Sequence, residues 1–195
     1  SYLELPLKEI KKRAKLAKER LASCILCPWK CHVNRTKGEL GHCKAPDNAV
    51  VYSFNAHFGE EPELVGAFGS GTIFFTHCNL NCIFCQNWEI SQEGRGSEVT
   101  PEHLARIMIQ LQNKKCHNIN LVTPTPHIAA ILEALPSAIE QGLQIPLVYN
   151  SGGYESRESL KLLDGIVDIY MPDFKYWEVK TAQRCSGPPD YPEKA

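Results

Sequence analysis

The sequence has no excess of charge of either sign, since 21 lysine and arginine residues accompany 22 aspartate and glutamate residues. It also lacks a basic stripe with interleaved aromatic residues, so nothing indicates a nucleic-acid partner. No run approaches the roughly 18 apolar residues that a membrane span requires. Residues 1–23 are charged throughout and lack the apolar core of a signal peptide. These absences predict a cytoplasmic protein without a membrane partner.

Cysteine, by contrast, is abundant: nine residues in a chain of 195, seven of them in two tight groups. Short-range cysteine groups in a reducing compartment indicate metal or iron–sulfur ligation rather than disulfides. Cys116 and Cys185 stand alone and are expected to be structural thiols. The grouped cysteines are Cys24, Cys27, Cys31 and Cys43 in the first set, and Cys78, Cys82 and Cys85 in the second.

The first third of the chain contains one predicted helix and little else that is regular. Residues 6–22 place apolar side chains at three- and four-residue spacing, with lysine and arginine opposite. The basic face is expected to be solvated, the alternative being a surface for an acidic partner. Residues 24–68 are interrupted by proline and glycine and are predicted to be loop-rich.

From Gly69 onward, β and α patterns alternate. Strands are predicted over 71–77, 119–123, 146–150 and 167–171, and helices over 100–112, 127–141 and 156–163. Pro136 is expected to kink or split the second of these helices. Strand–helix repetition with short helices predicts a parallel sheet with right-handed crossovers.

Four such units are about half of a closed barrel. The predicted fold is therefore α/β: a partial (β/α) barrel of parallel strands over residues 69–195. It follows an N-terminal helix and a small four-cysteine segment over residues 1–68. In parallel βα folds, chemistry gathers at the carboxyl ends of the strands. Those ends carry sulfur, polar or turn-forming residues, namely His77–Cys78, Thr123–Pro126, Asn150–Gly153 and Met171–Lys175.

Cys78, Cys82 and Cys85 follow the first of these strands directly. The Cys-x3-Cys-x2-Cys spacing is too compact to enclose a metal ion alone, but it can hold three corners of a [4Fe–4S] cluster. Such a cluster normally takes four thiolates, so three would leave one iron open, as in a reactive rather than a structural site. A small molecule could chelate that iron through an amine and a carboxylate. The alternatives are a zinc site or a chance grouping.

The stretch "CNLNCIFC" resembles the cysteine motif of radical S-adenosylmethionine (radical SAM) enzymes. Residues 69–90 look particularly like the pyruvate formate-lyase activating enzyme-like branch, and the resemblance extends over nearly the whole chain. It implies a [4Fe–4S] cluster on Cys78, Cys82 and Cys85, with S-adenosylmethionine on the open iron. A 5′-deoxyadenosyl radical would then take a hydrogen atom from the substrate. The implied partners are a protein substrate (a glycyl radical enzyme) and an external electron donor such as flavodoxin or ferredoxin.

The resemblance also implies roles for residues at other strand ends. Phe84 takes the aromatic position near the adenine, the alternative being core packing. In "MPDFK", Asp173 would help to hold a cation and Lys175 would lie near the charged groups of the cofactor, which makes both the candidate catalytic residues. Their alternative is a buried ion pair that only stabilises the barrel. Asn150 and Ser151 stand where the family often has Asp-Thr near the cofactor.

The sequence departs from the family pattern in two places. Residues 123–127, "TPTPH", replace the usual Gly-Gly-Glu, although Thr123, Thr125 and His127 could offer hydrogen bonds. His127 could equally cap the following helix, and His77 could serve only in packing. The chain ends before the family's further βα units, so the C-terminal part of the family fold is expected to be absent.

The first cysteine set has the spacing of a complete four-ligand site, suited to zinc or to a second [4Fe–4S] cluster. A metal could fold this segment, which has little core of its own. Two alternatives to an enzyme of the activating type remain open. One is a non-catalytic iron–sulfur or zinc-binding module, and the other is a radical SAM enzyme that modifies nucleic acid.

Overall fold

The computed structural model describes all 195 residues, and its centre is a six-stranded sheet with the order β3-β1-β2-β4-β5-β6. The strands are β1 (Ala49–His57), β2 (Ser70–Phe75), β3 (Ser97–Val99), β4 (Ile119–Val122), β5 (Leu147–Ser151) and β6 (Ile169–Pro172). The helices are α1 (Leu7–Glu19), α2 (Pro62–Val65), α3 (Trp88–Ser91), α4 (Pro101–Asn113), α5 (Ile128–Glu140), α6 (Arg157–Leu163), α7 (Val179–Ser186) and α8 (Tyr191–Lys194). None of the helices has the length and apolar character needed to cross a membrane.

Strands β2, β4, β5 and β6 are parallel neighbours, which confirms the predicted α/β fold with a parallel sheet. Their register places Leu121 between Ile73 on one side and Tyr149 on the other. Strand β1 pairs antiparallel with β2, and β3 pairs antiparallel with β1. The expectation of a loop-rich segment over 24–68 is therefore wrong for residues 49–57, which form β1. The apolar start of β1 is surrounded by proline and glycine, which obscure the strand pattern in the sequence.

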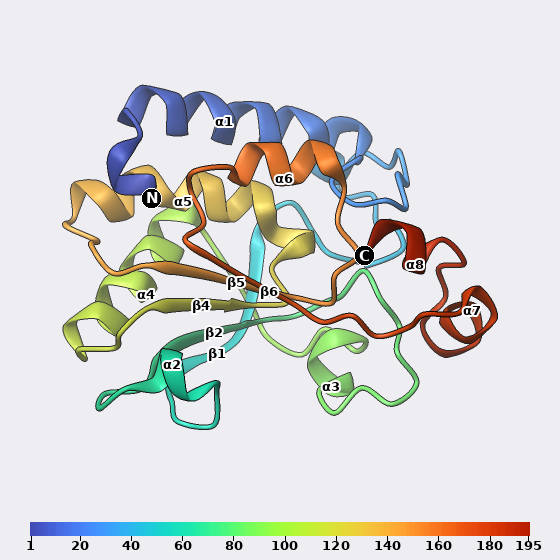
Figure 1. Cartoon of the computed structure of the whole chain (residues 1–195). Coiled ribbons are helices and arrows are strands. Elements are labelled where there is room, and N and C mark those ends of the chain that lie inside the picture. Colours follow the sequence, from blue (N-terminus) through green and yellow to red (C-terminus); the bar gives the residue numbers. More distant parts are fainter.

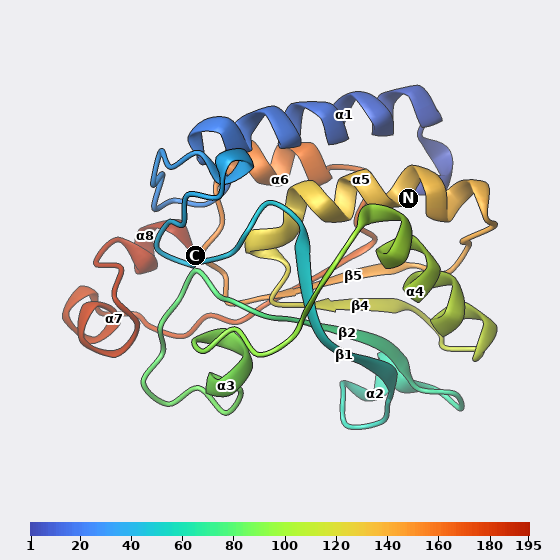
Figure 2. The ribbon, with the colours of Figure 1, turned by 180° about the vertical axis from the view of Figure 1, so that it is seen from behind.

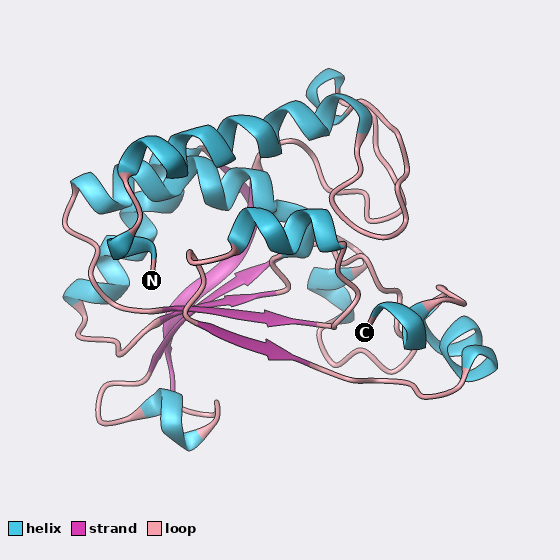
Figure 3. Cartoon of the chain, turned by 45° about the horizontal axis from the view of Figure 1, so that its top comes forward, coloured by secondary structure: helices cyan, strands magenta, loops and turns pink.

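The longer helices lie on one face of the sheet, whereas the opposite face is not covered by helices (Figures 1 and 3). Helix α5 packs between its neighbours α1 and α4, so α1 forms an outer layer (Figure 2). Alternate strand residues point to opposite faces. Ile73, Phe75, Leu121 and Tyr149 belong to the main hydrophobic core on the helix side. Polar residues such as Asn120 and Asn150 therefore lie toward the other face.

Two helices show how local chemistry sets their ends and course. Helix α4 begins within one residue of the predicted range. Thr100 is its N-cap and accepts a hydrogen bond from the amide of His103 (3.2 Å), and Pro101 stands at the first helical position. Pro136 was expected to kink or split helix α5, and the helix continues through the proline, so it is not split. Because α5 is apolar on most of its surface and is buried between the sheet and α1, packing holds it together despite the missing amide.

Candidate functional site

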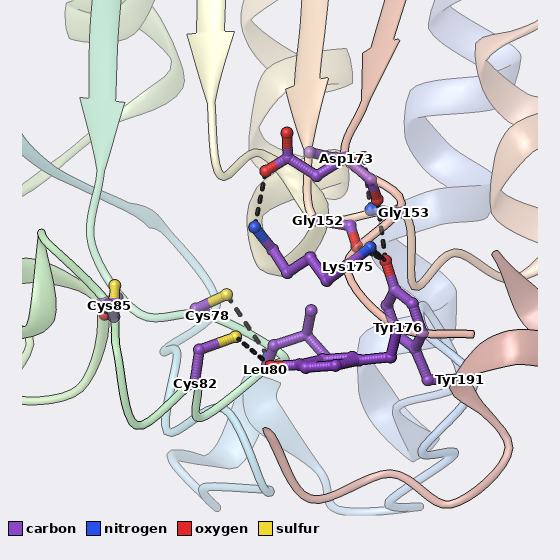
Figure 4. Close-up of polar contacts among 12 residues, drawn as sticks. Cys78, Leu80, Cys82, Cys85, Gly152, Gly153, Asp173, Lys175, Tyr176 and Tyr191 are labelled. Atoms are coloured by element: carbon purple, nitrogen blue, oxygen red, sulfur yellow. Dashed lines mark hydrogen bonds and ion pairs between the residues drawn. The ribbon is translucent and has the colours of Figure 1, made fainter. Parts of the chain in front are cut away.

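The loop after β2 carries three of the predicted ligands, Cys78, Cys82 and Cys85. His77 turns the chain at the end of the strand with a left-handed backbone (φ 62°). All three thiols are free. The amide of Leu80 donates to Cys78 Sγ (3.4 Å), which fixes the start of the loop. Figure 4 shows the sulfurs of Cys78 and Cys82 on the side of the loop that faces Tyr176, with Cys85 farther along.

The C-terminal segment packs against this loop. The Tyr176 hydroxyl donates to Cys82 Sγ (3.6 Å). The backbone of α7 accepts from the loop amides of Asn81 (3.2 Å, to Ser186) and Ile83 (2.9 Å, to Cys185). The predicted lone thiol Cys185 therefore lies beside the cysteine loop, and residues remote in sequence cover one side of it.

The donor set of the loop fits an iron–sulfur cluster. Burial raises the pKa of Cys78 to about 12, and the charges of Cys82 and Cys85 act in the same direction. The three thiols are thus close enough to influence one another, although no three metal-binding side chains in the structure are arranged as a formed metal site. Thiols in such surroundings become thiolates only when a cation lies among them, and soft thiolate sets suit iron–sulfur clusters.

Asp173 and Lys175 lie together beyond the end of β6. Lys175 Nζ contacts Asp173 Oδ2 at 2.6 Å, with the Asp173 side chain 62% exposed. Burial would lower the pKa of Lys175, but the hydrogen bond and the charge of Asp173 outweigh it and raise that pKa. Because the carboxylate is exposed, the pair adds little to stability. The pair lies beside the cysteine loop (Figure 4), where the positive charge of Lys175 acts to lower the pKa of Cys82 against the effect of burial.

The Tyr191 hydroxyl holds the ends of β5 and β6 together. It accepts from the amide of Lys175 (2.9 Å) and lies 2.8 Å from the carbonyl oxygens of both Gly152 and Asp173. Gly152 allows a close approach, because a Cβ there would lie 2.8 Å from the Leu80 side chain of the cysteine loop. Neither Tyr176 nor Tyr191 had a signal in the sequence, whereas the paired glycines after β5 could have indicated a close contact.

The other predicted cofactor-binding residues are not all brought together. Phe84 is 57% exposed and touches Tyr176 edge-on at 6.1 Å between ring centroids, so it is not a core residue. Asn150 lies toward the uncovered face, where its Nδ2 is 3.4 Å from a carboxylate oxygen of Glu60. Ser151 is buried, and its hydroxyl accepts from the amide of Gly153 (3.3 Å). Neighbouring strand residues face opposite ways, so Asn150 and Ser151 do not form one site.

His127 does not cap α5 through its side chain. Its Nε2 instead lies 2.8 Å from the carbonyl oxygen of Thr76, and its ring stacks on Phe75. Burial lowers the pKa of His127 to about 3, so the ring is neutral and donates this hydrogen bond. Its role here is to tie the end of β2 to the start of α5.

Glu155, which the sequence analysis missed, is a buried carboxyl group at the carboxyl edge of the sheet. It accepts hydrogen bonds from Thr125 Oγ1 (2.5 Å) and from the Tyr149 hydroxyl (3.1 Å). Burial raises the pKa of Glu155 to about 7, although the hydrogen bonds from Thr125, Tyr149 and Ser151 oppose that shift. Glu155 thereby links the segment after β4 to the turn after β5.

The raised pKa of Glu155 predicts a pH-dependent contribution to stability. The ordinary carboxyl pKa is 4.5, so between pH 4.5 and 7 the folded chain holds a proton that the unfolded chain has released. This contribution is present below pH 4.5 and is lost as the pH rises to 7, a loss of about 3 kcal/mol. The free energy of unfolding, measured with urea at pH 5 and at pH 7.5, should therefore fall more between these two pH values in the wild type than in Glu155→Gln. Equal pH dependence in the two proteins would contradict the assignment.

The four cysteines of the first set lie in the segment between α1 and β1. Cys24 is buried, whereas Cys27, Cys31 and Cys43 are partly buried, and all four are free thiols. Trp29 Nε1 in this segment donates to the carbonyl oxygen of Asn79 (2.7 Å), so the segment lies close to the cysteine loop.

Comparison with known proteins places this arrangement in a family context. Residues 72–194 match the sequence profile of the radical SAM superfamily. The uncharacterized protein MJ0674 of Methanocaldococcus jannaschii is 36% identical over 188 residues, which cover 92% of this chain and 53% of that protein. The uncharacterized protein MJ0808 of the same organism is 28% identical over 177 residues, covering 78% and 49% respectively. The chain spans about half the length of the curated relatives it matches.

Proposed function

This chain belongs to the radical SAM superfamily, and on that premise we propose that it is an enzyme of the pyruvate formate-lyase activating type. The observation that carries the proposal is the set of three free thiols in one short loop at the carboxyl end of β2. Cys78, Cys82 and Cys85 would hold the [4Fe–4S] cluster. The three-thiol set also favours this function over that of a plain electron carrier, which gains nothing from an iron without a protein ligand.

When bound, the cluster and S-adenosylmethionine supply a one-electron reductive cleavage that yields methionine and a 5′-deoxyadenosyl radical able to take a hydrogen atom from a substrate. The electron would come from an external low-potential donor of the flavodoxin or ferredoxin class. The substrate would be a protein with a reactive glycine, as in glycyl radical enzymes.

The residues of this chain would bind and orient the cofactor. Lys175 presents a positive charge beside Cys82 and would attract the negative groups of S-adenosylmethionine. Asp173 has an exposed carboxylate that could hold a cation. Phe84 offers an exposed aromatic face for the adenine. Asn150 would contribute a hydrogen bond from the uncovered face of the sheet, and Ser151 would support the turn that follows β5.

The proposal is tested by measuring 5′-deoxyadenosine. The chain is reconstituted anaerobically with iron and sulfide, reduced with dithionite and incubated with S-adenosylmethionine. Formation of 5′-deoxyadenosine and methionine above the level seen without protein is the expected result. A reconstituted cluster that yields neither product would instead support the non-catalytic metal-binding module.

A further inference from the structure

The strongest unexplained feature outside the site is a buried cation without an anionic partner. Arg35 is 3% exposed. Its Nε donates to the carbonyl oxygen of Pro46 (3.1 Å), Nη2 donates to the same oxygen, and Nη1 reaches Cys24 Sγ at 4.0 Å. Arg35 forms no ion pair with a carboxylate. Because a guanidinium stays charged in proteins, a buried one without a counter-ion is costly, so an anion is needed nearby.

The four cysteines of the first set lie in the same segment as this cation, and Cys24 is in contact with it. The amide of Cys24 donates to Val33 (2.9 Å) and the carbonyl of Cys24 accepts from His32 (3.0 Å), which places Cys31 beside Cys24. Gly41 brings the chain back, since a Cβ there would lie 3.0 Å from Cys31 Sγ. The amide of Lys30 donates to the carbonyl oxygen of Cys27 (3.1 Å) and the amide of Lys44 donates to that of Gly41 (3.0 Å), which closes the turns that carry Cys27 and Cys43. Burial raises the pKa of Cys27, and the charges of the other three cysteines act in the same direction.

Backbone amides are directed at these sulfurs. The amide of His42 donates to Cys31 Sγ (3.4 Å). The amides of Trp29 and Ala45, two residues after Cys27 and Cys43, oppose the effect of burial on the pKa of each preceding thiol. In the cysteine loop, the amide of Leu80 likewise donates to the sulfur of Cys78, two residues earlier. Amides that donate to sulfur stabilise thiolate ligands of metal centres.

We propose that Cys24, Cys27, Cys31 and Cys43 bind one thiophilic metal centre, a zinc ion or an iron–sulfur cluster, whose net negative charge is the counter-ion of Arg35. Four thiolates around either centre leave the site negative, as the buried guanidinium requires. No three of these side chains are arranged as a formed metal site in the structure. Binding therefore orders side chains on a backbone that already surrounds them.

The same segment is attached to the cysteine loop of the catalytic site. Trp29 Nε1 donates to the carbonyl oxygen of Asn79 (2.7 Å), and the Trp29 ring stacks on His42 with centroids 3.8 Å apart. His42 Nε2 lies 3.2 Å from Asn81 Nδ2. A metal centre that fixes residues 24–45 thus also supports the loop that carries Cys78 and Cys82.

The proposal is tested by measuring the metal content of variants that lack the three thiols of the cysteine loop. The Cys78→Ala/Cys82→Ala/Cys85→Ala protein, purified anaerobically, should retain about one zinc, or about four iron and four sulfide, per chain. The ratio of zinc to iron and sulfide identifies which centre is present. Adding Cys27→Ala and Cys43→Ala should remove this metal, whereas adding Cys116→Ala should not.

A metal-free triple variant with a native circular dichroism spectrum would overturn the proposal, whatever the activity of the wild type. If the triple variant does not fold, Cys27→Ala/Cys43→Ala in the wild-type background gives the answer. It should lose this complement of metal while keeping the cluster of the Cys78 loop. An unchanged metal content would equally overturn the site.

The role of Arg35 has its own readout, the thermal unfolding midpoint before and after removal of metal with a chelator. Removing the metal from the wild type leaves a buried cation without a counter-ion, whereas Arg35→Gln has no such charge. The midpoint of the wild type should therefore fall by at least about 3 °C more than that of the variant. Equal falls in the two proteins would refute the charge pairing.

Discussion

Cys82→Ala is expected to lose 5′-deoxyadenosine formation by more than about 100-fold. Loss of an outer-shell partner of a metal ligand typically costs about 10- to 100-fold, and loss of a ligand itself should cost more. Cys82 is one of three thiols in the loop, so its removal leaves only two for the cluster. The measurement is product formation by the anaerobically reconstituted and reduced protein.

The matched control is Cys116→Ala, which removes a cysteine that is also buried (2% exposed, against 7% for Cys82) but belongs to the main hydrophobic core rather than to the cysteine loop. Both variants lose one sulfur from a packed environment, so their structural costs should be similar. Far-UV circular dichroism should show the native fold in both. If Cys82→Ala forms 5′-deoxyadenosine as fast as the control, Cys82 does not hold a catalytic cluster.

Gly153→Ala is expected to lower the free energy of unfolding by about 2–4 kcal/mol. Gly153 has φ 78°, a conformation that costs an alanine about 1 kcal/mol or more. In addition, a Cβ at this position would lie 2.6 Å from the carbonyl oxygen of Asp173, so the turn after β5 must move away from the end of β6. Urea unfolding at fixed pH measures the loss.

Gly142→Ala separates the two causes. Gly142 also has a left-handed backbone (φ 92°), but no atom lies within 4 Å of the position of its Cβ. It should therefore show only the conformational cost of about 1 kcal/mol. If both glycine variants lose the same free energy, close packing between Gly153 and Asp173 contributes nothing.

Local patterns in the sequence were sufficient to predict the parallel part of the fold. Strands β2, β4, β5 and β6 have apolar or β-branched runs bounded by helix signals, and the order of elements then leaves few topologies. The cysteine loop was also predictable, because its three thiols follow β2 directly. Strand β1 was not, since its pairing with β2 depends on partners distant in sequence rather than on its own composition.

The supporting residues of the site were beyond sequence reasoning for the same reason. Tyr176 contacts Cys82 across 94 positions, and Tyr191 contacts Gly152 across 39, so no spacing rule connects them. Glu155 follows a turn with no pattern typical of a buried acid. Its role depends on Thr125, 30 residues earlier, and can be seen only after β4 and β5 have been placed side by side.

S-adenosylmethionine is expected to bind a cluster held by Cys78, Cys82 and Cys85. Electron paramagnetic resonance of the reconstituted, dithionite-reduced chain tests it most directly, recorded with and without S-adenosylmethionine. The Cys27→Ala/Cys43→Ala protein serves best, because any signal from the proposed second centre is then removed. We expect a cluster signal whose shape changes when S-adenosylmethionine is added. A cluster signal that is identical with and without S-adenosylmethionine would contradict it.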